Sequence, residues 1–281
     1  MSAERILSTA LRAWGARAIP FTCDGELFRT ASIERAFTLL DQSAALRSLM
    51  LLHGENGVGK SALAGSWLRS LETKTYFPIA VTQASLSGTG VLGFFLQKLG
   101  KIPRHQRNTN LKILEETFAE LGRITPVLVL DEAQNYSISA LEEVRMLLGL
   151  NLPQQPAFAL ILVGDQYLLN TLRLRSHHAL YTRIAAQVCL EKFTRPEVDL
   201  YLRHHLRAAG IERDCFETAA IDLLAAASAG FPRTINYLAR AAWLEAGKSG
   251  VLNITPNHVQ SALELVPSAL HGRRDTELSR P

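Results

Sequence analysis

The stretch from Gly54 to Ser61, GENGVGKS, is the part of the sequence whose residue types and spacing point most directly to chemistry. It fits the pattern Gly-x-x-x-x-Gly-Lys-Ser/Thr at every fixed position, and a loop of this pattern turns its backbone N–H groups toward phosphate oxygens. Lys60 would contact the β- and γ-phosphates, and the Ser61 hydroxyl would bind Mg²⁺. The predicted ligands are therefore ATP and Mg²⁺. The residues expected around the phosphates are Gly54, Glu55, Asn56, Gly57, Val58, Gly59, Lys60, Ser61 and Ala62.

A pair of carboxylates, Asp131 and Glu132, is the second chemical candidate, because it directly follows the apolar run PVLVL. Ligands of open parallel sheets bind at the carboxyl ends of strands, so the pair is expected near the phosphate loop. Asp131 would hold Mg²⁺ through water, and Glu132 would polarise the water that attacks the γ-phosphorus. Two exposed turn carboxylates without a catalytic role are the alternative. The apolar strand in front of the pair favours a role in ATP hydrolysis.

A third polar group, Asp165 and Gln166, follows the apolar run AFALILVG. At the tip of a strand beside the acidic pair, either side chain could order the attacking water. A strand tip needs polar turn residues in any case, so both a catalytic role and a plain turn role stay open.

Apolar runs that alternate with helical segments must position these residues. One run precedes Gly54, and four others read as strands at 75–81, 127–130, 157–164 and 184–190. Alternation of strands with helices predicts a parallel five-stranded sheet in a three-layer α/β/α core. Pro78 in the second run indicates an edge strand or an irregularity. Helices of this core are expected at 32–43, with Ser32 as N-cap, at 91–99 and at 139–150.

Helices without intervening strands follow Thr194, which predicts a small all-helical domain after the α/β core. In front of the core, residues 3–17 have the apolar spacing of an amphipathic helix that also carries arginines. This helix either packs on the body of the protein or serves as an arm that binds a partner or nucleic acid. The expected domains are an N-terminal arm at 1–19, the nucleotide-binding domain at 20–193, a helical lid at 194–266 and a flexible tail at 267–281.

The composition is that of a globular protein, with 47% hydrophobic and 20% charged residues in 281. Cys23, Cys189 and Cys215 lack the spacing of a disulfide framework or a zinc site, which favours a reducing cytoplasm. Neither a signal peptide nor a membrane-spanning run is recognisable. The net charge of +4 permits a polyanionic partner without requiring one.

The short segment from Lys98 to Lys112 is rich in basic residues. It is either a solvated loop or a patch that contacts the phosphodiester backbone of DNA. The candidate DNA contacts in it are Lys98, Lys101, Arg104, Arg107 and Lys112.

Together, GENGVGKS, LVLDEAQN, LVGDQ and GFPRTINYLARAA resemble the motifs of AAA+ ATPases, a P-loop NTPase family with an α/β domain and a helical lid. The resemblance covers residues 20–266. More narrowly, DEAQN followed by LEEVRMLL, LILVGDQYLLNTL and GFPRTIN is similar to a bacterial group. That group contains the secretion-pathway A protein and the transposon target-selection ATPases of the TniB, TnsC and MuB type.

The resemblance implies further roles. Arg233 would be the lid arginine that touches the γ-phosphate from the same chain, and Arg183 would be a finger that enters the site of a neighbouring subunit, with Arg173 and Arg175 as rivals. It also implies a homo-oligomer, a ring or a filament, that binds duplex DNA through backbone contacts. Relatives in secretion continue past the lid into a transmembrane segment, and this chain does not, which favours transposition and DNA recombination with a transposase as partner. An ATPase that assembles a secretion complex without DNA is the alternative.

Overall fold

The computed structural model describes residues 3–22, 25–82, 88–150 and 155–266. These residues form two compact units. Unit 1 consists of Met1–Thr30, Gly57–Gly59 and Glu191–Pro281, and unit 2 consists of Ala31–Asn56 and Lys60–Leu190. The tail expected at 267–281 lies outside the described residues, and so does Cys23.

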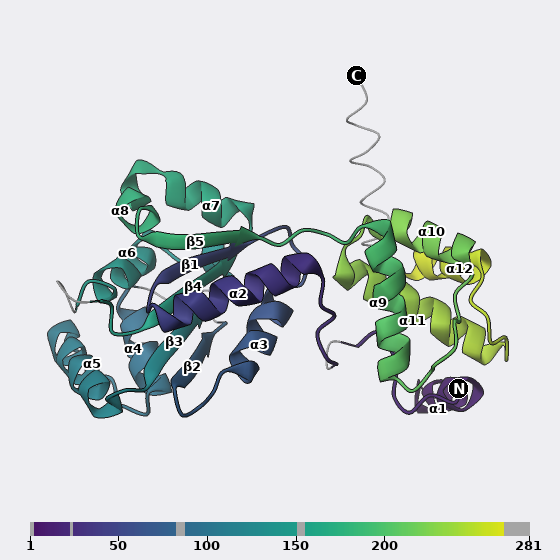
Figure 1. Ribbon diagram of the computed structural model, residues 1–281, viewed down its shortest axis with the longest axis horizontal. Helices are drawn as coiled ribbons and strands as arrows, with labels where there is room; N and C mark the ends of the chain where they lie inside the picture. The colour runs from purple at the N-terminus through teal and green to yellow at the C-terminus, as the bar shows by residue number, and fades with distance from the viewer. Residues whose placement is uncertain (1–2, 23–24, 83–87, 151–154, 267–281) are drawn as a thin grey trace, which may run out of the picture. The chain divides into compact units, whose positions relative to one another are not determined.

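Unit 2 contains a five-stranded sheet in the order β2-β3-β4-β1-β5 (Figure 1). Every pairing between neighbouring strands is parallel, which confirms the predicted sheet. β2 lies at one edge, as Pro78 indicated, and β5 lies at the other. The strands are β1 (Leu49–His53), β2 (Tyr76–Val81), β3 (Thr125–Leu130), β4 (Ala159–Gly164) and β5 (Ile184–Cys189).

Both faces of this sheet are covered, because alternate side chains of the central strands are buried on opposite sides. In β1, Leu49 and Leu51 belong to the core cluster of α4, α5 and α6, whereas Met50 and Leu52 are fully buried outside it. α2 packs on the sheet at β1, β4 and β5, and α3 contacts α2 and β4. The continuous apolar runs of the sequence are thus explained by two buried faces.

The helices of unit 2 begin and end close to the predicted bounds, with two differences. α2 begins at Ala31, so the prediction of Ser32 as its N-cap was wrong. α5 begins at Arg107, inside the polar segment that reads as a loop in the sequence. The helices are α2 (Ala31–Ala45), α3 (Lys60–Ser70), α4 (Gly88–Lys98), α5 (Arg107–Leu121), α6 (Ile138–Leu147), α7 (Gln166–Arg173) and α8 (His178–Tyr181), with short 3₁₀ turns η1 (Ala133–Asn135) and η2 (Arg175–His177).

Unit 1 is helical in its described part, apart from a single bridge between Phe216 and Ile254. Thr194 is the N-cap of α9, and its backbone N–H and hydroxyl both donate to the Glu197 carboxylate at 2.8 Å. No helix in the described ranges is both long and apolar enough to cross a bilayer. The helices of unit 1 are α1 (Ala3–Trp14), α9 (Arg195–Ala208), α10 (Thr218–Ser228), α11 (Pro232–Lys248) and α12 (Pro256–Leu265).

The N-terminal helix α1 packs against α11 within unit 1. Trp14 stacks on Trp243, with ring centroids 6.0 Å apart, and its Nε1 donates to the Trp243 carbonyl oxygen at 3.0 Å. A side chain at Gly247 would meet the Trp14 ring, since an added Cβ would lie 2.8 Å from Nε1. Of the two roles open for this helix, the structure therefore shows packing on the body.

Trp14→Ala is expected to destabilise unit 1 by about 3–5 kcal/mol, because the substitution empties a site where the side chain is only 4% exposed. Thermal or urea unfolding followed by circular dichroism measures the loss. Arg12→Ala, at an exposed position of the same helix, serves as control and should change stability little. Equal stability of the two variants would contradict the packing of α1 on α11.

Candidate nucleotide site

The loop between β1 and α3 has the backbone conformation that its glycines allow. Gly57 has a φ of +93° and Gly59 a φ of +100°, values that side chains with a Cβ rarely adopt. α3 begins at Lys60, directly after the second of these glycines. The loop thus leads into a helix N-terminus, where free backbone N–H groups and the helix dipole favour an anion.

Lys60 is held inside this loop. Its Nζ donates to the carbonyl oxygens of Gly54 at 2.8 Å and Glu55 at 3.0 Å, and the residue is only 6% exposed. Hydrogen bonds to these two loop carbonyl oxygens stabilise the buried ammonium group of Lys60 and do not neutralise its charge. Ser61 and Ala62 in the first turn of α3 are exposed, so the Ser61 hydroxyl is accessible to a ligand.

The acidic pair follows the carboxyl end of β3. Because the sheet is parallel, this end lies on the same side of the sheet as the carboxyl end of β1. Glu132 has a left-handed backbone with a φ of +51°, and its N–H donates to Asp131 Oδ1 at 2.9 Å. This bond uses one Asp131 oxygen, and the other oxygen can bind a cation. Carboxylate and hydroxyl oxygens are ligands that Mg²⁺ prefers beside phosphates and water, so Asp131 and Ser61 fit such an ion.

Gln134 also belongs to this site, although its sequence context predicts no role for it. Its Nε2 donates to Glu132 Oε2 at 2.6 Å, and its Oε1 is buried without a hydrogen-bond partner among the described residues. The only signal in the sequence was its place two residues after Glu132.

The end of β4 offers less than the sequence suggested. Asp165 caps α7, because one carboxylate oxygen accepts from the N–H groups of Tyr167 at 2.9 Å and Leu168 at 3.3 Å. Gln166 is exposed, and its Nε2 donates to Asn170 Oδ1 at 3.2 Å. The assignment of Gln166 to catalysis stays a prediction.

Two further buried polar groups lie on the strands and turns of this site. Burial lowers the pKa of His53, and the positive charges of Arg173 and Lys60 lower it further. Neither ring nitrogen of His53 has a hydrogen-bond partner in the described part of the chain. Burial, with the negative charge of Asp131, raises the pKa of Tyr136 to about 12. Both groups are thus uncharged at neutral pH.

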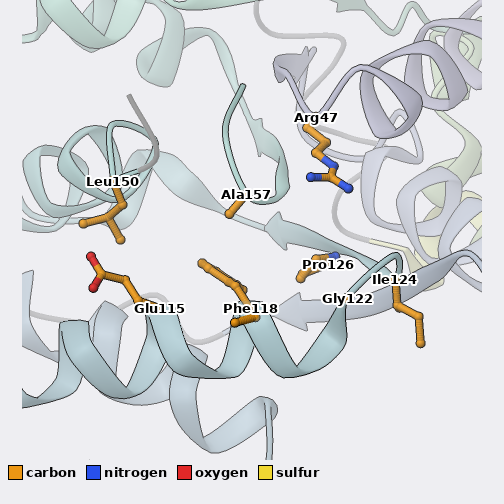
Figure 2. A pocket seen from close by; sticks show the side chains of 9 residues that line it. Arg47, Glu115, Phe118, Gly122, Ile124, Pro126, Leu150 and Ala157 are labelled. Carbon is orange, nitrogen blue, oxygen red and sulfur yellow. The ribbon is translucent and has the colours of Figure 1, made fainter. Parts of the chain in front are cut away.

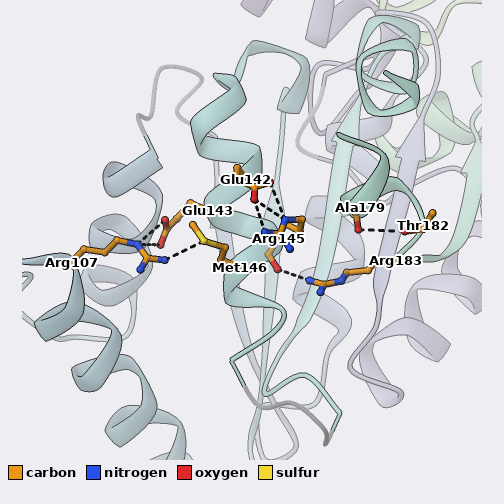
Figure 3. A network of polar contacts seen from close by, with 8 residues as sticks. All are labelled: Arg107, Glu142, Glu143, Arg145, Met146, Ala179, Thr182 and Arg183. Carbon is orange, nitrogen blue, oxygen red and sulfur yellow. Dashed lines mark hydrogen bonds and ion pairs between the residues drawn. The ribbon is translucent and has the colours of Figure 1, made fainter. Parts of the chain in front are cut away.

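The candidate finger arginines lie on one segment of unit 2. Arg183 is exposed, and its Nη1 donates to the carbonyl oxygen of Arg145 on α6 at 2.6 Å (Figure 3). Arg145 itself is paired with Glu142, which lowers the pKa of that carboxyl. Arg173 and Arg175 are also exposed. A guanidinium has five N–H donors, and among the described residues this bond to a carbonyl uses one of them.

In the basic segment from Lys98 to Lys112, proposed to contact DNA, several cationic side chains are paired within the chain. Lys101 pairs with Glu120 at 2.6 Å, and Lys112 lies 4.0 Å from Glu116. Lys98 lies over the ring of Phe94. Arg104 is exposed. These ion pairs reduce the positive potential of the segment, and its contact with DNA stays a prediction.

Arg107 has a structural partner in this segment. Its Nε donates to both carboxylate oxygens of Glu143, at 3.1 and 3.0 Å, and Glu143 is only 4% exposed (Figure 3). The sequence separation of this pair hid it from sequence analysis.

Arg107→Ala is expected to lower stability by about 1–3 kcal/mol, because it leaves the buried Glu143 carboxylate without its donor. Thermal unfolding of the purified chain measures the effect. The matched control is Arg104→Ala, whose side chain is exposed. A variant at Arg107 that weakens DNA binding at unchanged stability would show that DNA contact, and not this ion pair, is its main role.

Arg233 lies in the first turn of α11 and is exposed. Within unit 1, its backbone N–H donates to the carbonyl oxygen of Gly57 at 3.3 Å. Its contact with the γ-phosphate stays a prediction.

Unit 2 also contains a cavity of about 270 Å³ (Figure 2). Pro126 at the start of β3, Gly122 and Ala157 line it, with Arg47 and Glu115 among its polar side chains. Strand starts and strand ends lie at opposite edges of a parallel sheet, so this cavity does not belong to the phosphate loop and the acidic pair.

A protein-family model matches part of this chain. Residues 44–172 match the family model described as an AAA domain. General secretion pathway protein A of Aeromonas hydrophila is 29% identical over 233 residues, which cover 80% of this chain and 41% of the relative. The chain thus spans about two fifths of the length of that curated relative.

Solved structures share the fold. Cdc6p from Pyrobaculum aerophilum aligns with a TM-score of 0.70 and 19% identity, over 88% of this chain and 70% of that chain. The ORC1 protein of Aeropyrum pernix, in complex with DNA, aligns with a TM-score of 0.58 and 20% identity, over 90% of this chain and 67% of that chain.

Proposed function

We propose that this chain, a AAA+ P-loop ATPase, hydrolyses ATP within a homo-oligomer that assembles on duplex DNA. The observation that carries the proposal is the presence of a buried Lys60 ammonium and the Asp131–Glu132 pair at one edge of a parallel sheet. Its cellular role would be to select target DNA and to recruit or activate a transposase.

Each residue of the site has a task in this proposal. Lys60 binds the β- and γ-phosphates, and Glu132 accepts a proton from the attacking water. Ser61 and Asp131 would hold Mg²⁺, which neutralises phosphate charge when bound. Arg233 would contact the γ-phosphate from the lid of the same chain.

Assembly would complete the site. Arg183 is exposed on unit 2, with Arg173 and Arg175 on the same segment, and a guanidinium from a neighbouring subunit stabilises the charge of the transition state. Hydrolysis is then fast only in the oligomer.

Two features support DNA as the partner. The chain carries a net charge of +4, and one of the structures with the same fold was solved in complex with DNA. Contacts would go to backbone phosphates, so binding should show little base preference and should weaken steeply with salt.

The test measures ATPase rate and particle size with and without duplex DNA, at low and high salt. DNA-stimulated hydrolysis together with ATP-dependent particles or filaments is the expected result. A chain that stays monomeric with ATP and DNA at low salt would refute the proposal. Adding a candidate transposase then tests whether the DNA-bound assembly recruits it.

A second function is favoured by one observation, the similarity to general secretion pathway protein A. An ATPase that assembles a secretion or envelope complex through protein contacts would hydrolyse ATP at the same rate with or without DNA. The pairing of Lys101, Arg107 and Lys112 with carboxylates of the same chain fits this alternative as well.

A further inference from the structure

We propose that Gln134 positions the attacking water together with Glu132, as the second acceptor for its hydrogen atoms. The inference rests on the proposed role of Glu132 as base. It assigns to the end of β3 a function that the sequence suggested for the end of β4.

The amide of Gln134 is fixed in one orientation. A carboxylate oxygen can only accept a hydrogen bond, so the group that reaches Glu132 Oε2 at 2.6 Å must be the NH₂ of Gln134. The carbonyl oxygen Oε1 therefore points elsewhere. It is buried, and no hydrogen-bond donor reaches it within the part of the chain that the structure describes.

Gly164 at the end of β4 makes room for this amide. A Cβ added at Gly164 would lie 2.9 Å from Gln134 Oε1, closer than real Cβ contacts allow. The amide thus packs against the backbone of the neighbouring strand. Gln134 reaches this place from η1, the turn that follows β3, since β3 and β4 are paired.

The polar residues after Gly164 are engaged elsewhere. The Asp165 carboxylate caps α7, and Gln166 is exposed and bonded to Asn170. By contrast, the Gln134 amide donates to the Glu132 carboxylate, and its own carbonyl oxygen accepts no hydrogen bond among the described residues. An unpaired buried carbonyl oxygen destabilises a fold, so its presence beside Glu132 points to a donor that arrives with the substrate.

Water is the donor that fits. One of its O–H groups would donate to Glu132 and the other to Gln134 Oε1, which leaves an oxygen lone pair for the γ-phosphorus. The water oxygen then bonds to phosphorus, and the bond from phosphorus to the bridging oxygen breaks with its electrons going to ADP. The water proton passes to Glu132, and the products are ADP and phosphate.

The test compares Gln134→Leu and Gln134→Glu with the matched control Gln97→Leu, at an exposed position of α4. Steady-state hydrolysis gives kcat, and titration with a fluorescent ATP analogue gives Kd. Gln134→Leu should lower kcat about 10- to 100-fold with little change in Kd. In a Glu132→Gln background it should cause no further loss, because the two residues act on one water.

The variant Gln134→Glu tests the pH dependence of kcat, which would not change if Gln134 had only a structural role. A second carboxylate beside Glu132 disfavours its ionised form, so the acid limb of the kcat–pH profile should move to higher pH. This nearly isosteric variant also keeps the test valid if the leucine variant fails to fold.

The proposal would be overturned if the kcat of Gln134→Leu equalled or exceeded that of Gln97→Leu. It would also be overturned if Gln134→Leu caused a further loss of kcat in the Glu132→Gln background. An unchanged kcat–pH profile in Gln134→Glu would overturn it as well. Full activity of Glu132→Gln alone would instead refute the proposed base, so the two failures are distinguishable.

Discussion

Glu132→Gln is expected to lower kcat for ATP hydrolysis by about 100- to 10,000-fold while ATP still binds. An amide cannot take a proton from water, so the base is lost. The site should keep its shape, because a glutamine carbonyl oxygen can still accept the hydrogen bond from Gln134 that Glu132 Oε2 accepts at 2.6 Å. ATP then persists in the site, and the assembled form should accumulate.

Phosphate release, binding of a fluorescent ATP analogue and sedimentation measure these three effects on one preparation. Glu212→Gln is the matched control, since it makes the same substitution at an exposed glutamate that has no role in the site. Unchanged turnover in Glu132→Gln would remove Glu132 from catalysis. Weak ATP binding in the same variant would mean that its carboxylate serves the loop structure.

Lys60→Ala is expected to weaken ATP binding by about 30- to 150-fold, the equivalent of about 2–3 kcal/mol for a lost charge-assisted hydrogen bond. The effect should be large because Lys60 is only 6% exposed, so water cannot readily replace its ammonium group. Titration with a fluorescent ATP analogue measures it, and hydrolysis should fall below detection at ordinary ATP concentrations.

Lys74→Ala is the matched control, with the same substitution at an exposed lysine of unit 2. Melting temperatures of both variants separate binding from stability, because Lys60 also satisfies the carbonyl oxygens of Gly54 and Glu55. A Lys60→Ala protein that is folded and binds ATP normally would refute the assignment of the phosphate loop.

Local features of the site could be read from the sequence. The conformation from Gly54 to Lys60 depends on residues next to one another, and the glycines and lysine define it. The acidic pair follows an apolar run long enough to identify β3, and the buried faces of the sheet follow from such runs.

Features that depend on strand order or distant pairing could not be read. Gln134 enters the site because β3 lies beside β4, and the sequence does not give that order. Arg107 read as a free loop cation because its partner Glu143 is 36 residues away. α5 begins there without a side-chain cap, so nothing local marked its start.

The three tryptophans are divided between the two units, so each unit has its own fluorescent side chains. Of the three tryptophans, these two stack in unit 1, while Trp67 lies in α3 of unit 2, where its Nε1 donates to Asp41 Oδ1 at 2.8 Å. Fluorescence of a Trp67→Phe protein would then follow the melting of unit 1 alone, and the difference from the parent protein would follow unit 2.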